Sequence, residues 1–224
     1  FGLFSVGLGQ SFAFVLVPPL ARDLGLSVVE TSLIFSISAV AWAITSSSWG
    51  RVSDKYGRRN IAVIGLIGYS VSIIALITPL FLVERNLLDF VFLLPLLIFG
   101  RLINGLIGSA TRPAAFAYIA DISERTKRTK KFARLESSFL IGTIMGPMIG
   151  GFLFLYSKPL PFYIFAICGF TSALGIFCTF PKTTLLKEKA EDMLSNISFK
   201  DKSVWPFLFT AALSSLCQAS LLQS

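Results

Sequence analysis

The sequence predicts an all-α membrane protein that crosses the bilayer several times. Of its 224 residues, 54% are hydrophobic and only 14% are charged, and its mean hydropathy is +0.75. A soluble domain carries roughly a quarter charged residues, so this balance argues against a water-soluble enzyme, and the 22 phenylalanines exclude a disordered chain. The apolar runs are continuous and lack the alternation of outer-membrane strands, so we expect helices, which satisfy their own backbone groups in lipid.

Long uncharged runs mark the expected spans, because about 20 apolar residues in a helix cross a hydrocarbon core of about 30 Å. Six runs reach this length: residues 1–21, 31–50, 60–83, 137–157, 159–181 and 203–224. The run 90–100 is shorter, but the chain stays apolar as far as Ala120 apart from two arginines, so we count this stretch as a seventh span. Ser27 and Glu30 have the spacing of a capping box at the start of the second span.

A long polar segment divides these spans into two groups. Residues 182–202 form the longest polar stretch of the chain and follow the sixth expected span. We therefore predict a six-helix N-terminal bundle over residues 1–181, a cytoplasmic linker over 182–203 and the first helix of a second bundle over 204–224. Because the chain begins with Phe and its last span has no polar flank, we expect it to be a piece of a longer protein.

The positions of the basic residues predict the orientation in the membrane. The net charge is +8, and the Lys and Arg residues outside the spans gather in alternate connections, with 15 in one set of three and three in the other. The first set is 50–60, 121–136 and 182–202, and the second holds Arg22, Arg85 and Lys158. Because Lys and Arg collect in cytoplasmic loops, we expect the first set and the N-terminus in the cytoplasm. The basicity thus indicates a lipid bilayer as partner and no nucleic acid.

The sequence offers no residue set for a metal, a cofactor or enzyme chemistry. Histidine is absent, and Cys168, Cys178 and Cys217 fall within expected spans, where thiols act as small apolar fillers. Neither a disulfide framework nor a metal-ligand spacing is present, and the spans contain no Ser-His arrangement and no paired Asp. We therefore expect no metal, no cofactor and no enzymatic activity.

The connection between the second and third spans contains more than a positive charge. It reads Gly50-Arg-Val-Ser-Asp54-Lys-Tyr-Gly57-Arg58-Arg59. Gly50 allows a close approach of helices, Gly57 suits a turn, and Asp54 can pair with Arg58 one helical turn later. A solvated positive loop would require only the basic residues, and it would not explain two glycines and an acid at these spacings.

This connection resembles the loop signature of the major facilitator superfamily, G-x-x-x-D-[RK]-x-G-R-[RK], at every defined position. The resemblance implies a cytoplasmic latch in which the acid and the arginine pair with an acid at the end of the fourth helix, where Asp121 stands. It implies a gate that holds the outward-open state. The gate residues are Gly50, Asp54, Gly57, Arg58, Arg59 and Asp121.

The fifth span contains the string Gly142-Thr-Ile-Met-Gly146-Pro147-Met-Ile-Gly150-Gly151. Three of its glycines fall four residues apart, so they share one face and let another helix approach closely, as in ordinary transmembrane packing. Pro147 permits a bend. The full string resembles the antiporter motif of tetracycline-type drug:proton exporters in the same superfamily. The resemblance implies a hinge in this helix and favours export over uptake.

Arg101 lies about 16 Å from the outer end of the fourth span, near the bilayer midplane. A charge there must face protein or water, so we predict a functional role, with a structural tie between helices as the alternative. The run from Arg101 to Gly108 resembles the helix-four motif of the family, with Asn104 where Gln is usual, and implies a role in proton coupling or substrate binding. Arg112, farther along the span, is expected to anchor the helix at the cytoplasmic surface.

The first span departs from the exporter pattern. Those exporters usually carry an acid in this helix, whereas Gln10 is its only large polar residue here. We expect Gln10, Arg101 and Asn104 to line the substrate site, and the carboxylate that carries the proton to lie in the second half of the protein.

Together these features predict a secondary transporter of the major facilitator type in a bacterial inner membrane. It would exchange protons for a small amphipathic molecule, exported by alternating access. The expected partners are the substrate, protons, the bilayer and the C-terminal six-helix half. Two alternatives stay open: an importer or facilitator of a small organic anion bound by Arg101, and a transport-inactive sensor or assembly partner.

Overall fold

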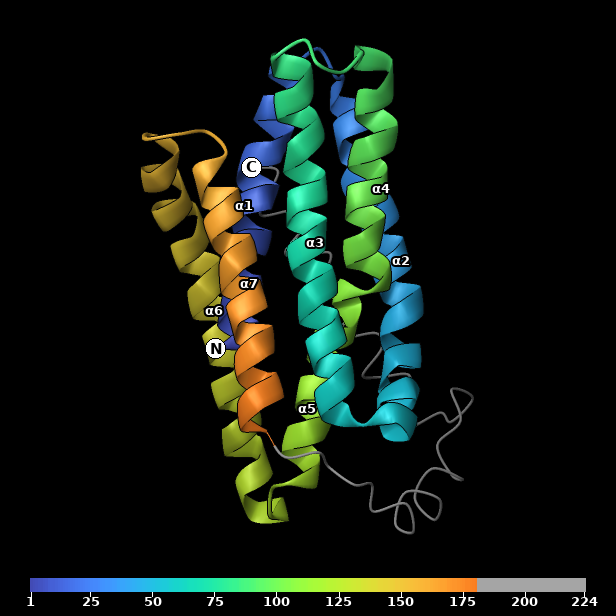
Figure 1. The fold of residues 1–224 in the computed structure, drawn as a ribbon. Helices are drawn as coiled ribbons and strands as arrows, with labels where there is room; N and C mark the ends of the chain where they lie inside the picture. The colour runs from blue at the N-terminus through green and yellow to red at the C-terminus, as the bar shows by residue number, and fades with distance from the viewer. Residues whose placement is uncertain (181–224) are drawn as a thin grey trace. The chain divides into compact units, whose positions relative to one another are not determined.

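A computed structural model of the protein describes residues 1–180, apart from the side chain of Arg125. Every regular element in this part of the chain is helical, which confirms the predicted all-α class (Figure 1). The elements are α1 (Gly2–Asp23), α2 (Val28–Tyr56), α3 (Arg58–Glu84), η1 (Phe90–Phe92), α4 (Leu93–Leu106), η2 (Gly108–Ala110), α5 (Thr111–Asp121), α6 (Arg125–Phe154) and α7 (Leu160–Thr179). The predicted linker and the predicted seventh span lie outside the described residues.

Six segments of the described chain are long and apolar enough to cross a membrane. The fourth of them, Phe90–Asp121, is composite, because a 3₁₀ turn at η2 separates α4 from α5. Pro113 explains this interruption of the single helix that was expected. It has no N–H for the carbonyl of Ser109, and its ring crowds that carbonyl, so the preceding turn tightens.

The two basic connections in the described chain are much shorter than the sequence indicates. Gly57 alone joins α2 to α3, and its φ of +95° is one that glycine adopts without strain. α6 begins at Arg125, so most of the basic segment 121–136, which was expected as a loop, is helical. We call the end of the bundle that carries these two connections the basic end; it is at the bottom of Figure 1.

At the opposite end, α2 begins with the predicted capping box. The hydroxyl oxygen of Ser27 accepts a hydrogen bond from the Glu30 N–H at 3.2 Å, and the Glu30 carboxylate accepts one from the Ser27 N–H at 2.8 Å. Nearby, Lys158 pairs with Glu84 and ties the connection between α6 and α7 to the end of α3. Local sequence therefore fixes where α2 starts.

The core centres on α3, which packs against α1, α4, α5 and α7. Tyr69 of α3 is 2% exposed and donates a hydrogen bond to the Ser5 carbonyl of α1 at 2.9 Å. Glycines on both neighbouring helices make room for it. A Cβ on Gly9 would lie 2.1 Å from the Tyr69 hydroxyl oxygen, and one on Gly169 would lie 3.1 Å from the ring. The Tyr69 side chain thus fills the space between α1 and α7.

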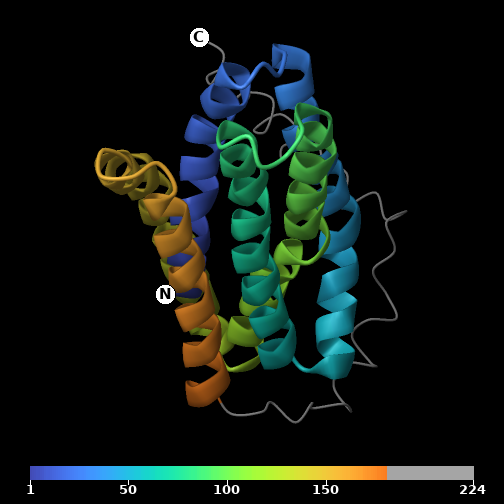
Figure 2. The same cartoon turned by 45° about the horizontal axis from the view of Figure 1, so that its top comes forward.

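α2 and α6 form opposite flanks of the bundle (Figures 1 and 2). α2 packs mainly on α4, and α6 packs mainly on α1. They are the two least buried spans, although both are strongly apolar. Side chains such as Val40 of α2 and Ile144 of α6 are more than half exposed. Such faces require a covering of lipid or of further helices.

Candidate functional site

Arg58, the first residue of α3, ties three helices together at the basic end. Its guanidinium pairs with Asp54 of α2, and its Nε donates a hydrogen bond to Asp121 of α5 at 3.0 Å. Its Nη1 also donates to the Ser53 hydroxyl at 2.7 Å and to the Gly50 carbonyl at 3.3 Å. The structure therefore contains the Asp54–Arg58 pair that the spacing predicts, and it brings Asp121 to the same guanidinium.

The other residues of the loop signature have different surroundings. No described atom lies within 4 Å of a Cβ placed on Gly50, so the close helix approach expected there is not seen. Arg59 lies apart from the Arg58 cluster: its Nη1 donates to the Phe180 carbonyl at 2.7 Å, and its guanidinium lies 4.7 Å from the Phe177 ring. Arg59 therefore ties the start of α3 to the end of α7.

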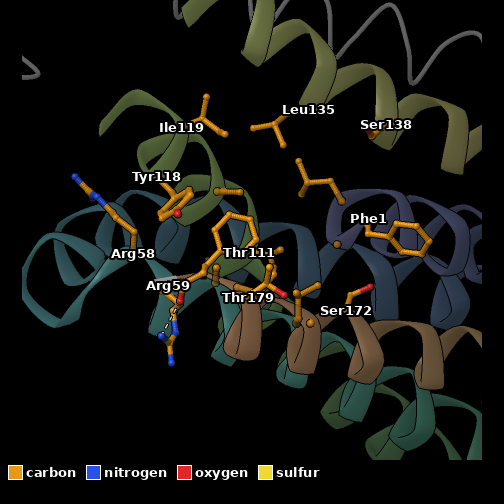
Figure 3. A pocket seen from close by; sticks show the side chains of 18 of the residues that line it. Phe1, Arg58, Arg59, Thr111, Tyr118, Ile119, Leu135, Ser138, Ser172 and Thr179 are labelled. Atoms are coloured by element: carbon orange, nitrogen blue, oxygen red, sulfur yellow. Dashed lines mark hydrogen bonds between the residues drawn. The ribbon is translucent and has the colours of Figure 1, made fainter. Parts of the chain in front are cut away.

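A mainly apolar cavity of about 400 Å³ borders the Arg58 cluster. It is lined by residues of α1, α3, α5, α6 and α7. In Figure 3 the side chains of Arg58 and Arg59 extend away from the cavity, whereas the hydroxyl of Ser172 lies at its wall. Arg58 and Arg59 thus border the cavity, but their guanidinium groups point away from it and bind neighbouring helices to one another.

The glycines of α6 form a close contact with α1. A Cβ would lie 2.4 Å from the Phe4 carbonyl oxygen if placed on Gly142, and 2.3 Å from the Leu8 carbonyl oxygen if placed on Gly146. On Gly150 it would lie 2.2 Å from the Phe12 ring. The prediction that three glycines share one face against a neighbouring helix is confirmed.

The other two residues of this string lie outside that contact. A Cβ on Gly151 would meet no described atom within 4 Å, so Gly151 does not take part in the helix contact. Pro147 lies within α6 and leaves the carbonyl of Thr143 without its helical donor. The predicted role of these residues as a hinge stays a prediction.

The contact between α1 and α6 leads to a matched pair of variants. Gly146→Ala is expected to lower the free energy of unfolding by about 1–3 kcal/mol, because its new methyl group meets a backbone carbonyl that cannot move aside. Gly151→Ala is expected to be neutral or to stabilise by up to about 1 kcal/mol, because the methyl group enters open space and alanine favours a helix. Unfolding of the full-length protein in mixed micelles measures both, and equal effects would contradict the close contact.

Arg101 of α4 is 5% exposed, so its charge faces the protein interior, as predicted for a charge near the midplane. Its guanidinium carbon lies 4.7 Å from the centre of the Phe35 ring of α2 and 5.3 Å from that of Phe14 of α1. The Arg101 carbonyl accepts a hydrogen bond from the Ser38 hydroxyl at 2.8 Å. Among the described residues, no carboxylate pairs with the guanidinium, and its Nε is enclosed without a hydrogen-bond partner.

The other two predicted site residues form no hydrogen bond with Arg101. Asn104 is half-buried, and its side-chain oxygen lies 2.5 Å from the position of a Cβ on Gly108, so the amide lies along its own helix. Gln10 is half-buried and forms no side-chain hydrogen bond within the described residues. The aromatic partners Phe14 and Phe35 were missed, because apolar runs rich in Phe give no sign of which rings face a charge.

A second arginine of the fourth span also has a partner that the sequence did not indicate. Arg112 of α5 pairs with Glu136 of α6, and its guanidinium lies 4.6 Å from the Phe139 ring. The expectation that Arg112 anchors its helix at the cytoplasmic surface stays a prediction. The pairing could not be foreseen because α6 starts early, which turns Glu136 from an expected loop residue into a helical one.

Comparison with known proteins identifies the fold. The family model of the Major Facilitator Superfamily matches residues 1–224. The chain belongs to the major facilitator superfamily. Together with the six apolar helices, this membership indicates a multi-pass membrane protein.

Bacterial members of the superfamily named for drug resistance are among the relatives of the chain. It is 28% identical to the quinolone resistance protein NorA of Staphylococcus aureus (strain MRSA252) over 98% of this chain and 53% of the relative. It is 30% identical to NorA of strain Mu50 over 87% of this chain and 46% of the relative. It is also 30% identical to the class B tetracycline resistance protein of Escherichia coli over 79% of this chain and 41% of the relative. The chain thus spans about half the length of these relatives.

Proposed function

We propose that this chain is the N-terminal half of a secondary transporter that exports a small amphipathic molecule in exchange for protons. The observation that carries the proposal is the contact of α6 with α1, in which two glycines of an exporter-type string meet backbone carbonyls of α1 and a third meets the Phe12 ring. The names of the relatives, which refer to resistance against quinolones and tetracycline, support export of a drug-like molecule. Alternating access would move this half against a second six-helix half around a midplane site.

The proposal places the binding site on the side of the bundle where α1, α2 and α4 meet at Arg101. Arg58, with its partners on α2 and α5, would act as a latch at the basic end, because its ion pairs can break and re-form as the helices move. The proton-carrying carboxylate is assigned to the second half of the protein, since the first span, where exporters of this type usually carry an acid, has Gln10 as its only large polar residue.

Flux into everted membrane vesicles tests the proposed function. Vesicles that contain the full-length protein should accumulate a fluorescent amphipathic dye when respiration acidifies their interior, and a protonophore should release it. Vesicles with an Arg58→Gln variant serve as the control for dye that merely binds to membranes. Accumulation that persists with the protonophore would contradict proton exchange, and accumulation equal to that of vesicles without the protein would contradict transport.

A second candidate function is import or facilitated movement of a small organic anion. It is favoured by Arg101, a buried cation without a carboxylate partner among the described residues. The same vesicles decide between the two functions, because an importer would move its anion out of everted vesicles and would not need acidification of their interior.

The proposed orientation places the N-terminus and the basic end in the cytoplasm of a bacterial inner membrane. We expect a cysteine at position 158 to react with an impermeant thiol reagent in intact cells, and a cysteine at position 127 to react only after permeabilisation. Both side chains are at least half exposed, so access in the folded protein is not limiting. The native cysteines of the full-length protein are replaced first. Labelling at 127 in intact cells would contradict the orientation.

A further inference from the structure

Arg101 has a feature that the proposed transport cycle does not require. Its side chain is nine-tenths buried, it carries a permanent charge, and no described carboxylate neutralises it. A buried charge is expensive unless it is paired or hydrogen-bonded, and the cost is greater near the middle of a membrane. The charge of Arg101 therefore needs an anionic partner that the described residues do not supply.

Two aromatic rings belong to the same site. The centres of the Phe14 and Phe35 rings lie 4.8 Å apart at an interplanar angle of 28°, which is a stacked arrangement. The guanidinium carbon of Arg101 lies 4.7 Å from one ring centre and 5.3 Å from the other. The three groups form a nearly equilateral triangle, so each touches the other two and the guanidinium is not sandwiched between the rings.

One side of this triangle is open. Phe14 is 47% exposed, whereas Arg101 is almost enclosed. The Nε of Arg101 is fully buried and has no hydrogen-bond partner in the described chain. The two terminal nitrogens make no hydrogen bond to a described residue, and the guanidinium carbon lies 5.3 Å from the centre of the half-exposed Phe14 ring.

We propose that Arg101, Phe14 and Phe35 form a receptor for a planar aromatic ring that carries a carboxylate. The ring would stack on Phe14, and the carboxylate would accept two parallel hydrogen bonds from the terminal nitrogens of Arg101. Phe14 and Phe35 are then specificity-determining residues. The inference rests on the proposed function in that it names the substrate class of the same site.

The carboxylate could also come from an acidic side chain of the protein outside the described residues, and charged probes separate the two sources. Four probes are titrated into the purified full-length protein by calorimetry: 1-naphthoate, 1-naphthylmethylammonium, 1-naphthalenemethanol and cyclohexanecarboxylate. With a free receptor, 1-naphthoate binds about tenfold or more tightly than each of the others. If 1-naphthylmethylammonium binds as well as 1-naphthoate, an acid of the protein already neutralises Arg101 and the proposal is overturned.

Variants assign the effect to the three residues. Arg101→Gln should weaken 1-naphthoate about tenfold or more and leave 1-naphthalenemethanol unchanged. Phe14→Leu and Phe35→Leu should weaken 1-naphthoate about threefold to tenfold and leave cyclohexanecarboxylate unchanged. Phe90→Leu should have no effect, because Phe90 is an exposed phenylalanine outside the triangle, at the end of the bundle away from the basic end. Unchanged 1-naphthoate binding in Arg101→Gln overturns the proposal.

The outcome is independent of the folding of any variant and of the direction of transport. Should Arg101→Gln not fold, the ranking of the four probes on the unmodified protein still decides the question. Binding is measured without a gradient, so a receptor for aromatic carboxylates without dye export refutes the proposed function alone. Export without preference for 1-naphthoate refutes this inference alone.

Discussion

Arg58→Gln is expected to reduce the rate of transport about tenfold or more while the Kd of the substrate changes less than about threefold. The guanidinium of Arg58 holds Asp54 of α2 and Asp121 of α5 against the first turn of α3. Its removal leaves two carboxylates facing each other without a counter-charge, so the closed arrangement of the basic end loses stability. The substrate site proposed at Arg101 lies elsewhere in the bundle and should be unaffected. Initial rates in vesicles and equilibrium binding to the purified protein give the two quantities.

The matched control for this prediction is Arg51→Gln. Arg51 lies near the end of α2 in the same signature and carries the same charge, but its side chain is exposed. A loss of transport in both variants would show that the basic end needs positive charge in general, as a membrane-facing loop does. An increase of Kd by about tenfold in Arg58→Gln would place Arg58 in the binding site and refute the latch. Asp121→Asn should resemble Arg58→Gln, whereas Glu124→Gln, a change at an exposed acid nearby, should not.

Several parts of this arrangement could be predicted from the sequence because they depend on residues close together in the chain. The Asp54–Arg58 pair follows from a spacing of one helical turn, and the capping box at Ser27 follows from a spacing of three. The shared face of Gly142, Gly146 and Gly150 follows from helical periodicity, whereas the identity of α1 as the neighbouring helix does not. In each case one element decides which side chains share a face.

The contacts of Arg101 and Arg112 depend on which helices are neighbours in the bundle. The pattern of apolar residues in a single sequence does not predict this. The rings of Phe14 and Phe35 come from two helices and meet a charge on a third. In a chain with 22 phenylalanines, their composition and spacing do not distinguish them from rings that face lipid. The pairing of Glu136 was missed for another reason. The many basic residues before it indicated a loop, whereas most of that segment forms the first turns of α6.

Arg101→Met is expected to abolish transport without destabilising the protein. The unfolding free energy should stay unchanged or rise by about 1–3 kcal/mol, because an uncompensated charge in the interior costs more than its ring contacts return. Each contact of a guanidinium with an aromatic ring contributes about 0.5–2 kcal/mol, and methionine keeps part of the packing. Arg58→Met should show the opposite pattern in stability, with a loss of about 1–3 kcal/mol, because it leaves two carboxylates without their partner.

Unfolding and vesicle flux on the same three samples decide this contrast. Arg85→Met, a change of an exposed arginine at the opposite end, should alter neither quantity. A clear loss of stability in Arg101→Met would mean that Arg101 is a structural tie between α1, α2 and α4. Normal transport by this variant would also contradict a role of Arg101 in the substrate site. Arg101→Lys should restore little activity, since an ammonium group keeps the charge but has no planar fork of donors. Full activity with Lys would show that charge alone is needed. We thus expect the two arginines to differ: Arg58 stabilises the protein through its pairs with Asp54 and Asp121, whereas Arg101 lowers stability and is expected to bind an anionic partner.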